Sequence, residues 1–154
     1  MSSLATWRSP VLQQQSTTAC PKDQYVKSYP GVLTLENYLQ ESHALVSPRG
    51  RVPGNVDMAL SQQNLERHVQ VTLPHILAIP AMIASTDLIV TVATRIANRF
   101  AKDYNLQMFS PPIALAGFDI SMAWHQSTNN DKAIQWLRSE LISIGQIIAT
   151  GVQV

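Results

Sequence analysis

The sequence predicts an α/β domain built around a mainly parallel sheet, and three observations predict it. Strand-length apolar segments alternate with helical segments through the middle of the chain, which is the pattern of βαβ units. One of these segments, "DLIVTV" at residues 87–92, is a β-branched run typical of a strand buried on both faces. The chain has 154 residues and 45% hydrophobic content, which suits one folded domain with a substantial core.

The N-terminal part of the chain predicts little regular structure before its first helix. Residues 1–16 show no clear period and are expected to be irregular or to form an edge segment, and "STTAC", residues 16–20, is expected to be extended. "TLENYLQ" then predicts a short helix that ends near residue 40. Thr34 is a suitable N-cap, and Glu36 places a negative charge in the first turn, where the helix dipole favours it.

The next two strands are separated by a loop and a helix. "HALVS", residues 43–47, has strand length and is followed by "PRGRVPG", residues 48–54, which is rich in proline and glycine. "NVDMALSQQN", residues 55–64, predicts a helix with Asn55 as its cap. "HVQVTL", residues 68–73, alternates apolar and polar residues and predicts a strand with one buried face.

Two helices flank the buried strand. "PHILAIPAMIAS", residues 74–85, is helical by length and content, and Pro80 is expected to kink it. "TRIANRFAKDYN", residues 94–105, places its apolar residues on one helical face and predicts an amphipathic helix. "LQMF", residues 106–109, predicts a short strand.

The C-terminal part joins a strand to a helix. "FDISMAWH", residues 118–125, alternates in the manner of a strand, and a helix is expected to begin near residues 129–131. Together the patterns divide the chain into an irregular segment, 1–16, a main α/β unit with its entering strand, 17–110, and a returning strand with a C-terminal helix, 111–154. The last helix presents an apolar stripe made of Ile134, Leu137, Leu141, Ile144 and Ile148.

The composition of the chain indicates which classes of partner it can bind and in which cellular compartment it is expected. Charged residues make up only 14% of the chain, so we expect its surface to be covered by an oligomeric contact or by a larger body. The net charge of +1 gives no electrostatic footprint for nucleic acid. One cysteine, Cys20, and the absence of a signal peptide pattern favour the cytoplasm. Residues 71–93 are long enough to cross a membrane, but Asp87 and two prolines favour burial in a protein core.

Catalytic, metal and cofactor chemistry are not indicated. Asp119, Ser121 and His125 share one face of the predicted strand, but Ser121 and His125 would lie roughly 13 Å apart along it. A catalytic triad needs hydrogen-bond contact, so we predict that the chain is no enzyme. No HxxxH, CxxC or phosphate-binding glycine motif occurs, so no metal or cofactor is expected.

A binding site is the stronger prediction. In an open α/β sheet, ligands bind beyond the carboxyl ends of strands. Ser47, Arg49 and Arg51 lie at and beyond the end of one predicted strand. Thr72, Pro74 and His75 lie at the end of the next strand and the start of a helix. The two arginines, the serine hydroxyl and the histidine could cradle a small carboxylate. Alternatively, the arginines are solvated loop charges and His75 is a capping or core histidine. We prefer this alternative for Arg51 and leave both interpretations open for Arg49 and His75.

Three stretches, taken in order, resemble a known family. They are "LTLENYLQESHALVSPRGRVPGNVDMAL", "VTLPHILAIPAMIASTDLIVTVATRIANRFA" and "FDISMAWHQSTNNDKAIQWLRSELI". Together they resemble the effector-binding domain of LysR-type transcriptional regulators, in the branch of nodulation and aromatic-catabolism activators, over roughly residues 17–144.

The resemblance implies a fold of the type 2 periplasmic-binding-protein kind. The chain would hold mainly one Rossmann-like subdomain, residues 33–109, with crossing strands at 17–20 and 118–125 and a C-terminal helix. The family's N-terminal helix-turn-helix and most of its first subdomain have no counterpart here, so we expect half the ligand cleft to be absent and no DNA contact by this chain. Ala93 stands where the family commonly has proline.

The resemblance also implies a function and a site. We expect an effector-sensing domain that binds a small anionic molecule, such as a carboxylate or an aromatic acid, and controls transcription, with a homo-oligomer as the assembly. The alternative is a dimerisation module without a ligand. The implied ligand-binding positions are Ser47, Pro48, Arg49, Gly50, Pro74, His75 and Ile76.

Overall fold

The computed structural model describes residues 6–14, 16–21, 32–48, 50 and 53–149. These residues form two compact units, one within residues 1–14 and 117–154 and the other within residues 15–116. The second unit carries the helices and strands predicted for the middle of the chain. The first joins both ends of the chain, so the segments predicted separately at the N- and C-termini belong to one unit.

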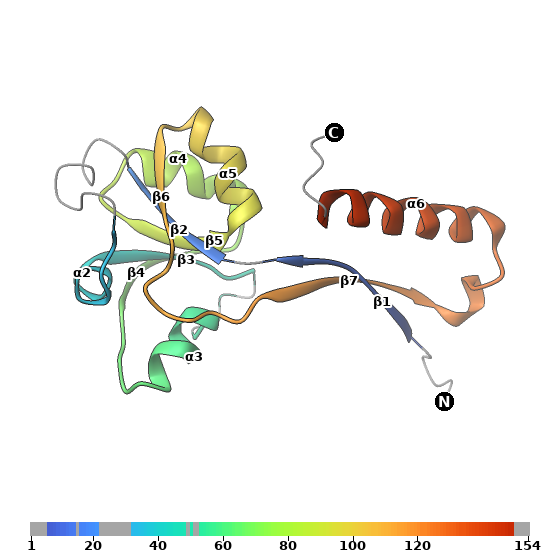
Figure 1. Cartoon of the computed structure of the whole chain (residues 1–154), viewed down its shortest axis with the longest axis horizontal. Coiled ribbons are helices and arrows are strands. Elements are labelled where there is room, and N and C mark those ends of the chain that lie inside the picture. Colours follow the sequence, from blue (N-terminus) through green and yellow to red (C-terminus); the bar gives the residue numbers. More distant parts are fainter. Residues whose placement is uncertain (1–5, 15, 22–31, 49, 51–52, 150–154) are drawn as a thin grey trace. The chain divides into compact units, whose positions relative to one another are not determined.

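The larger unit is built on a five-stranded sheet with the strand order β4-β3-β5-β2-β6 (Figure 1). Strand β3 pairs in parallel with β4 and β5, whereas β2 pairs antiparallel with β5 and β6. Four strands therefore run in one direction and β2 runs against them, which confirms the α/β class and makes the sheet mixed. The strands are β2 (Ser16–Pro21), β3 (Ser42–Val46), β4 (His68–Leu73), β5 (Ile89–Ala93) and β6 (Leu106–Phe109).

Helices cover both faces of this sheet (Figure 1). On one face, α4 (Ile79–Ala84) and α5 (Thr94–Asp103) contribute Ile79, Ile83 and Ala97 to a core that includes Val90 of the sheet. On the other face, α2 (Leu35–Gln40) and α3 (Asn55–Ser61) form a second core around Ile89. Strand β5 contacts both cores, which explains why its sequence is apolar without alternation.

The observed N-caps confirm the predicted N-cap of α2 and correct the predicted N-cap of α3. The Thr34 side chain accepts a hydrogen bond from the Asn37 amide at 3.3 Å, as expected for the N-cap of α2. Asn55 was predicted to cap α3, but the N-cap is Gly54, whose amide donates to the Asp57 carboxylate at 2.7 Å. The carboxylate three residues into the helix supplies the bond that a glycine cap cannot.

The segment after β4 differs from the prediction of one kinked helix. Residues Ile76–Ala78 form the 3-10 helix η1, and α4 begins only at Ile79. Pro80 lies at the first turn of α4, where the missing amide hydrogen costs nothing, so it starts a helix and does not bend one.

The smaller unit pairs β1 (Thr6–Gln14) with β7 (Phe118–His125) in an antiparallel two-stranded sheet. The irregular structure predicted for this region is wrong for residues 6–14, because β1 pairs with a strand that is distant in the sequence. Helix α6 (Lys132–Ala149) follows a short 3-10 helix, η2 (Gln126–Thr128), and packs on β1. The Asp131 carboxylate accepts from the amides of Ala133 and Ile134, so it caps the start of α6. Among the described residues, no helix is both long and apolar enough to span a membrane.

Candidate functional site

The two predicted loops lie side by side. Val46, the last residue of β3, is the partner of Leu73, the last residue of β4. The Ser47 amide then donates a hydrogen bond to the Leu73 carbonyl at 2.9 Å. Because the two strands are parallel, the loop after each one leaves from the same edge of the sheet. The structure therefore brings Ser47 next to the segment that begins at Pro74.

The loop after β3 is a tight turn. The Gly50 amide donates to the Ser47 carbonyl at 2.9 Å, and Gly50 has a positive φ of 63°. Ser47 is buried, whereas Pro48 and Gly50 are exposed. A Cβ on Gly50 would meet nothing within 4 Å, so the backbone conformation and not the available space favours glycine here. The predicted Arg49, like Arg51, lies outside the described residues.

The loop after β4 exposes the predicted histidine. His75 is the N-cap of η1, with an extended backbone and no side-chain capping bond. Pro74 and His75 are exposed, and Ile76 is half-buried. Since η1 has three residues, its dipole is weaker than that of the long helix predicted at this position. Any anion here would therefore depend on side chains and individual amides more than on a helix end.

A buried polar network fixes the chain that leaves the first loop. Arg67 donates from Nε to Asp57 Oδ1 at 2.7 Å and from Nη2 to Asp57 Oδ2 at 3.2 Å. Its Nη1 lies 3.3 Å from His43 Nδ1, and His43 Nε2 lies 2.8 Å from the Tyr38 carbonyl. Because Asp57 also holds the Gly54 amide, this network ties the start of α3 to β3.

The charges in the network are set by burial and by Arg67. Burial opposes ionisation of Asp57, but the hydrogen bonds from Arg67 and Gly54 outweigh it and lower the pKa of that carboxyl. Burial lowers the pKa of His43 to about 4, although its bond to the Tyr38 carbonyl acts in the opposite direction. His43 is therefore neutral at pH 7, with Nε2–H donating to Tyr38 and Nδ1 accepting from Arg67.

A row of hydroxyl groups lies on the same face of the sheet. The Tyr38 hydroxyl is 2.9 Å from Thr91 Oγ1, which is 3.1 Å from Thr18 Oγ1. Burial raises the pKa of the Tyr38 hydroxyl, so it stays protonated and can serve as a donor. Thr18 and Tyr38 are fully buried, and the row joins α2 to strands β5 and β2.

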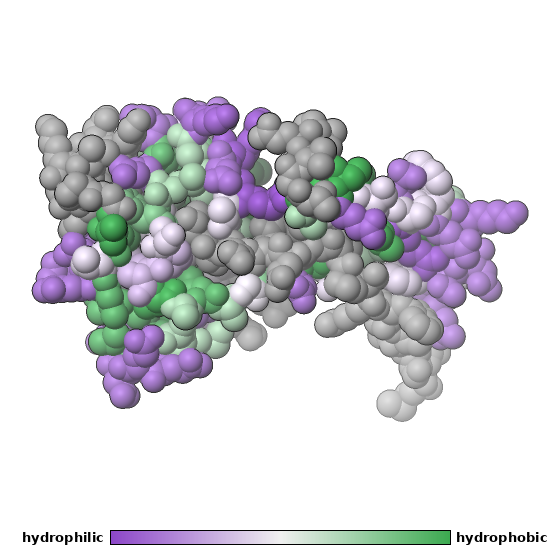
Figure 2. Space-filling view, in the orientation of Figure 1, coloured by the Kyte–Doolittle hydropathy of each residue, from purple (hydrophilic) through white to green (hydrophobic). Residues whose placement is uncertain are grey.

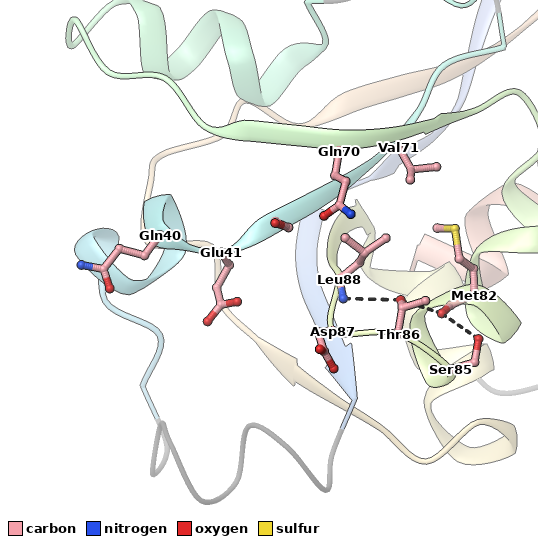
Figure 3. A pocket seen from close by; sticks show the side chains of 10 residues that line it. Gln40, Glu41, Gln70, Val71, Met82, Ser85, Thr86, Asp87 and Leu88 are labelled. Carbon is pink, nitrogen blue, oxygen red and sulfur yellow. Dashed lines mark hydrogen bonds between the residues drawn. The ribbon is translucent and has the colours of Figure 1, made fainter.

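A groove of about 630 Å3 opens at the opposite end of the sheet, where β3 and β5 begin. It is lined by residues 40–42 at the α2–β3 junction, 70–71 on β4, and 82 and 85–88 around the end of α4. Figure 3 shows the carboxylates of Glu41 and Asp87 on the side of the recess away from β4. The sequence did not point to this groove, because ligand sites are expected at the carboxyl ends of strands.

The possible catalytic residues of β7 form no triad. Asp119, Ser121 and His125 are all exposed on the strand. His125 Nδ1 lies 2.7 Å from Ser127 Oγ and accepts from the Ser127 amide at 3.2 Å, so the ring caps η2. Within the described part of the chain, no group of three or more His, Cys, Asp or Glu side chains could hold a metal ion.

Comparison with known proteins decides the family. Residues 7–144 match the family model described as "LysR substrate binding domain". The chain belongs to the LysR substrate-binding domain family. The prediction from the three quoted stretches is thereby confirmed, and the match also takes in most of β1.

The relatives with known roles are transcriptional regulators. The chain is 30% identical to the transcriptional activator NahR of Pseudomonas putida over 134 residues, which are 87% of this chain and 44% of NahR. It is 34% identical to nodulation protein D 3 of Rhizobium leguminosarum bv. phaseoli over 111 residues, which are 71% of this chain and 37% of that protein. The chain thus spans less than half the length of these LysR-type relatives.

Solved LysR structures share the fold. The regulatory domain of MexT from Pseudomonas aeruginosa superposes with a TM-score of 0.78 and 32% identity, covering 90% of this chain and 67% of that domain. The effector-binding domain of QuiR in complex with shikimate superposes with a TM-score of 0.70, covering 92% of this chain and 66% of that one. QuiR is 12% identical, so this likeness shows the fold alone.

Proposed function

We propose that this chain is the effector-sensing part of a LysR-type transcriptional regulator. Its ligand would be a small carboxylate, bound at the adjoining loops Ser47–Gly50 and Pro74–Ile76. The observation that carries the proposal is the 2.9 Å hydrogen bond from the Ser47 amide to the Leu73 carbonyl, since it joins the two loops. Shikimate, which is bound to the QuiR domain, is itself a carboxylate, and this supports the ligand class.

The residues of the two loops suit such a ligand. Ser47 offers a hydroxyl, and the exposed His75 ring can donate from a nitrogen. Arg49 would supply the bidentate guanidinium contact that carboxylates favour. Pro48, Gly50, Pro74 and Ile76 would shape the rim and leave the backbone accessible.

The proposal extends to the whole regulator. The bound state would alter transcription through a DNA-binding domain elsewhere in the protein, while this chain itself makes no DNA contact. A location in the cytoplasm and the absence of catalysis are part of the same proposal, supported by the regulators that the chain resembles.

A thermal-shift screen with aromatic and aliphatic carboxylates tests the site. Ligand at ten times its Kd adds about 1.4 kcal/mol of stability, which raises Tm by roughly 3–6 °C for a domain of this size. We expect His75→Ala and Arg49→Ala to remove most of that rise. Two matched controls, His125→Ala and Arg99→Ala, should keep it, because both residues lie outside the two loops.

Two results would contradict the sensing role. One is that no carboxylate in the screen raises Tm. The other is that the loop variants respond as strongly as the matched controls.

Self-association without a ligand is the second candidate, and the surface of α6 favours it. At about 100° per residue, Ile134, Arg138 and Gly145 share one face of α6, and each is at least half-buried. A second apolar sector lies beside that face, and Figure 2 shows hydrophobic residues near the C-terminal end of the helix. The exposed members are Trp136, Leu137, Leu141, Ile144 and Ile147. An exposed sector of this size is typical of a contact surface.

Light scattering after gel filtration tests this candidate. We expect the wild-type chain to form a homo-oligomer and the double variant Leu137→Ser, Ile144→Ser to be a monomer. Ser139→Ala, on the polar side of α6, is the control and should behave as wild type. A wild-type chain that is monomeric at its highest soluble concentration would refute self-association through α6.

A further inference from the structure

The loop that follows β3 is held in place at both ends. At its start, the Ser47 amide donates to the Leu73 carbonyl at 2.9 Å. At its end, Gly54 has an extended backbone with a φ of −93°, and it lies so close to β3 that an added Cβ would meet Leu45 Cδ1 at 3.0 Å. Lack of space therefore favours glycine at residue 54, whereas a positive φ favours it at Gly50. The chain thus leaves the end of β3 and returns to contact the same strand.

One buried side chain connects this return point to two strands. Asp57 Oδ2 accepts from the Gly54 amide at 2.7 Å and from Arg67 Nη2 at 3.2 Å. Arg67 Nη1 lies 3.3 Å from His43 Nδ1 on β3, and Arg67 itself directly precedes β4 (His68–Leu73). Its side chain is only 1% exposed, so it cannot contact a ligand at the surface. Arg67 therefore holds the end of the loop after β3 and the start of the strand that leads to the loop after β4.

Stability alone does not explain a charged pair at this position. A buried ion pair loses the hydration of both charges, and well-packed apolar side chains of similar volume are often as stable. The guanidinium fork differs from an apolar contact because it bonds in fixed directions: Nε and Nη2 meet the two Asp57 oxygens, and Nη1 meets His43. An apolar replacement would fill the space but would give the Gly54 amide no acceptor at a defined point. The pair therefore specifies a geometry more than it adds stability.

We propose that Arg67 is a positioning residue for the carboxylate site. It acts through Asp57 on Gly54, and the fixed position of Gly54 sets where the loop presents Ser47 and Gly50 to a ligand. Because the Gly50 amide donates to the Ser47 carbonyl at 2.9 Å, these two residues respond together. The effect on affinity rests on the proposed function, whereas the effect on the loop can be measured without any ligand.

Residual dipolar couplings of the backbone amides in the 154-residue chain measure the orientation of the loop. Arg67→Lys keeps the positive charge without the fork, and the double variant Asp57→Leu, Arg67→Met replaces the pair by apolar side chains. The double variant should stay folded, because it buries no unpaired charge. We expect the couplings of Ser47 and Gly50 to change in both variants, and more in the double variant. Ile83→Ala destabilises the core on the opposite face of the sheet and should leave these couplings unchanged.

Titration with shikimate, followed by amide chemical shifts, measures the effect on affinity. The Kd should rise roughly three- to tenfold in the double variant and stay at the wild-type value in Ile83→Ala. Wild-type couplings at Ser47 and Gly50 in the double variant would overturn the proposal, as would a wild-type Kd. If those couplings change while the wild-type chain binds neither shikimate nor benzoate, Arg67 positions the loop as proposed and only the carboxylate site is wrong.

Discussion

Acid should destabilise the larger unit through one buried histidine. His43 is fully buried, and burial lowers its pKa from 6.5 to about 4. The unfolded chain therefore binds a proton near pH 6.5 that the folded chain takes up only near pH 4. At about 1.4 kcal/mol per pKa unit, the shift corresponds to roughly 3 kcal/mol of folding stability. This contribution is complete above pH 6.5 and is lost as the pH falls toward 4.

Two neighbours of His43, Tyr38 and Asp57, keep their protonation states between pH 6.5 and pH 4. Tyr38 stays protonated because burial raises its pKa. Asp57 remains ionised because its pKa is lowered from 3.8. His68 also acts electrostatically on His43, and the background substitution His68→Gln removes that interaction.

Urea unfolding followed by circular dichroism between pH 7 and pH 4.5 measures the effect. The free energy of unfolding should fall by about 2–3 kcal/mol across this range in the wild-type chain. His43→Gln keeps a donor for the Tyr38 carbonyl but cannot take up a proton, so its stability should vary much less with pH. His125→Gln is the matched control and should lose stability as the wild type does. If His43→Gln and the wild type lose the same stability, the reasoning about His43 is refuted.

Three further substitutions probe the loops and the core, each measured by urea unfolding at pH 7. Gly50→Ala should cost about 1 kcal/mol because Gly50 has a φ of 63°, and an unchanged midpoint would contradict that strain. Tyr38→Phe should cost about 1 kcal/mol through loss of its bond to Thr91, and a stabilised variant would show that the hydroxyl row is dispensable. Ile83→Ala should cost about 2–5 kcal/mol because Ile83 is fully buried, whereas the control Met58→Ala, at an exposed site, should cost far less; equal losses would refute the assigned core.

The sequence predicted those elements whose residues alternate or repeat locally. Strand β4 (His68–Leu73) and strand β7 (Phe118–His125) occupy the predicted ranges, because their alternating pattern matches the two faces of a strand. Strand β1 was missed because its partner is more than a hundred residues away in the sequence, and local pattern carries no information on that pairing. Pro80 was predicted to kink a long helix, because a uniformly apolar segment does not show that α4 begins only after the 3-10 helix η1.

The candidate site could be predicted in its outline only. Parallel strands end at one edge of a sheet, so the sequence was sufficient to place Ser47 near Pro74. Their role in binding stays a prediction. The groove at Glu41 and Asp87 could not be predicted, because the residues that line it come from the α2–β3 junction, β4 and the end of α4. Only the folded sheet brings these separate segments together.

Amide NMR during titration with a carboxylate that raises Tm shows directly whether the ligand binds at the loops Ser47–Gly50 and Pro74–Ile76. If the two loops bind the ligand, saturable shifts should appear at Ser47, Gly50, His75 and Ile76, at ligand concentrations that leave residues 85–88 unchanged. Shifts confined to the groove or to α6, with Ser47 and His75 unaffected at saturation, would contradict it.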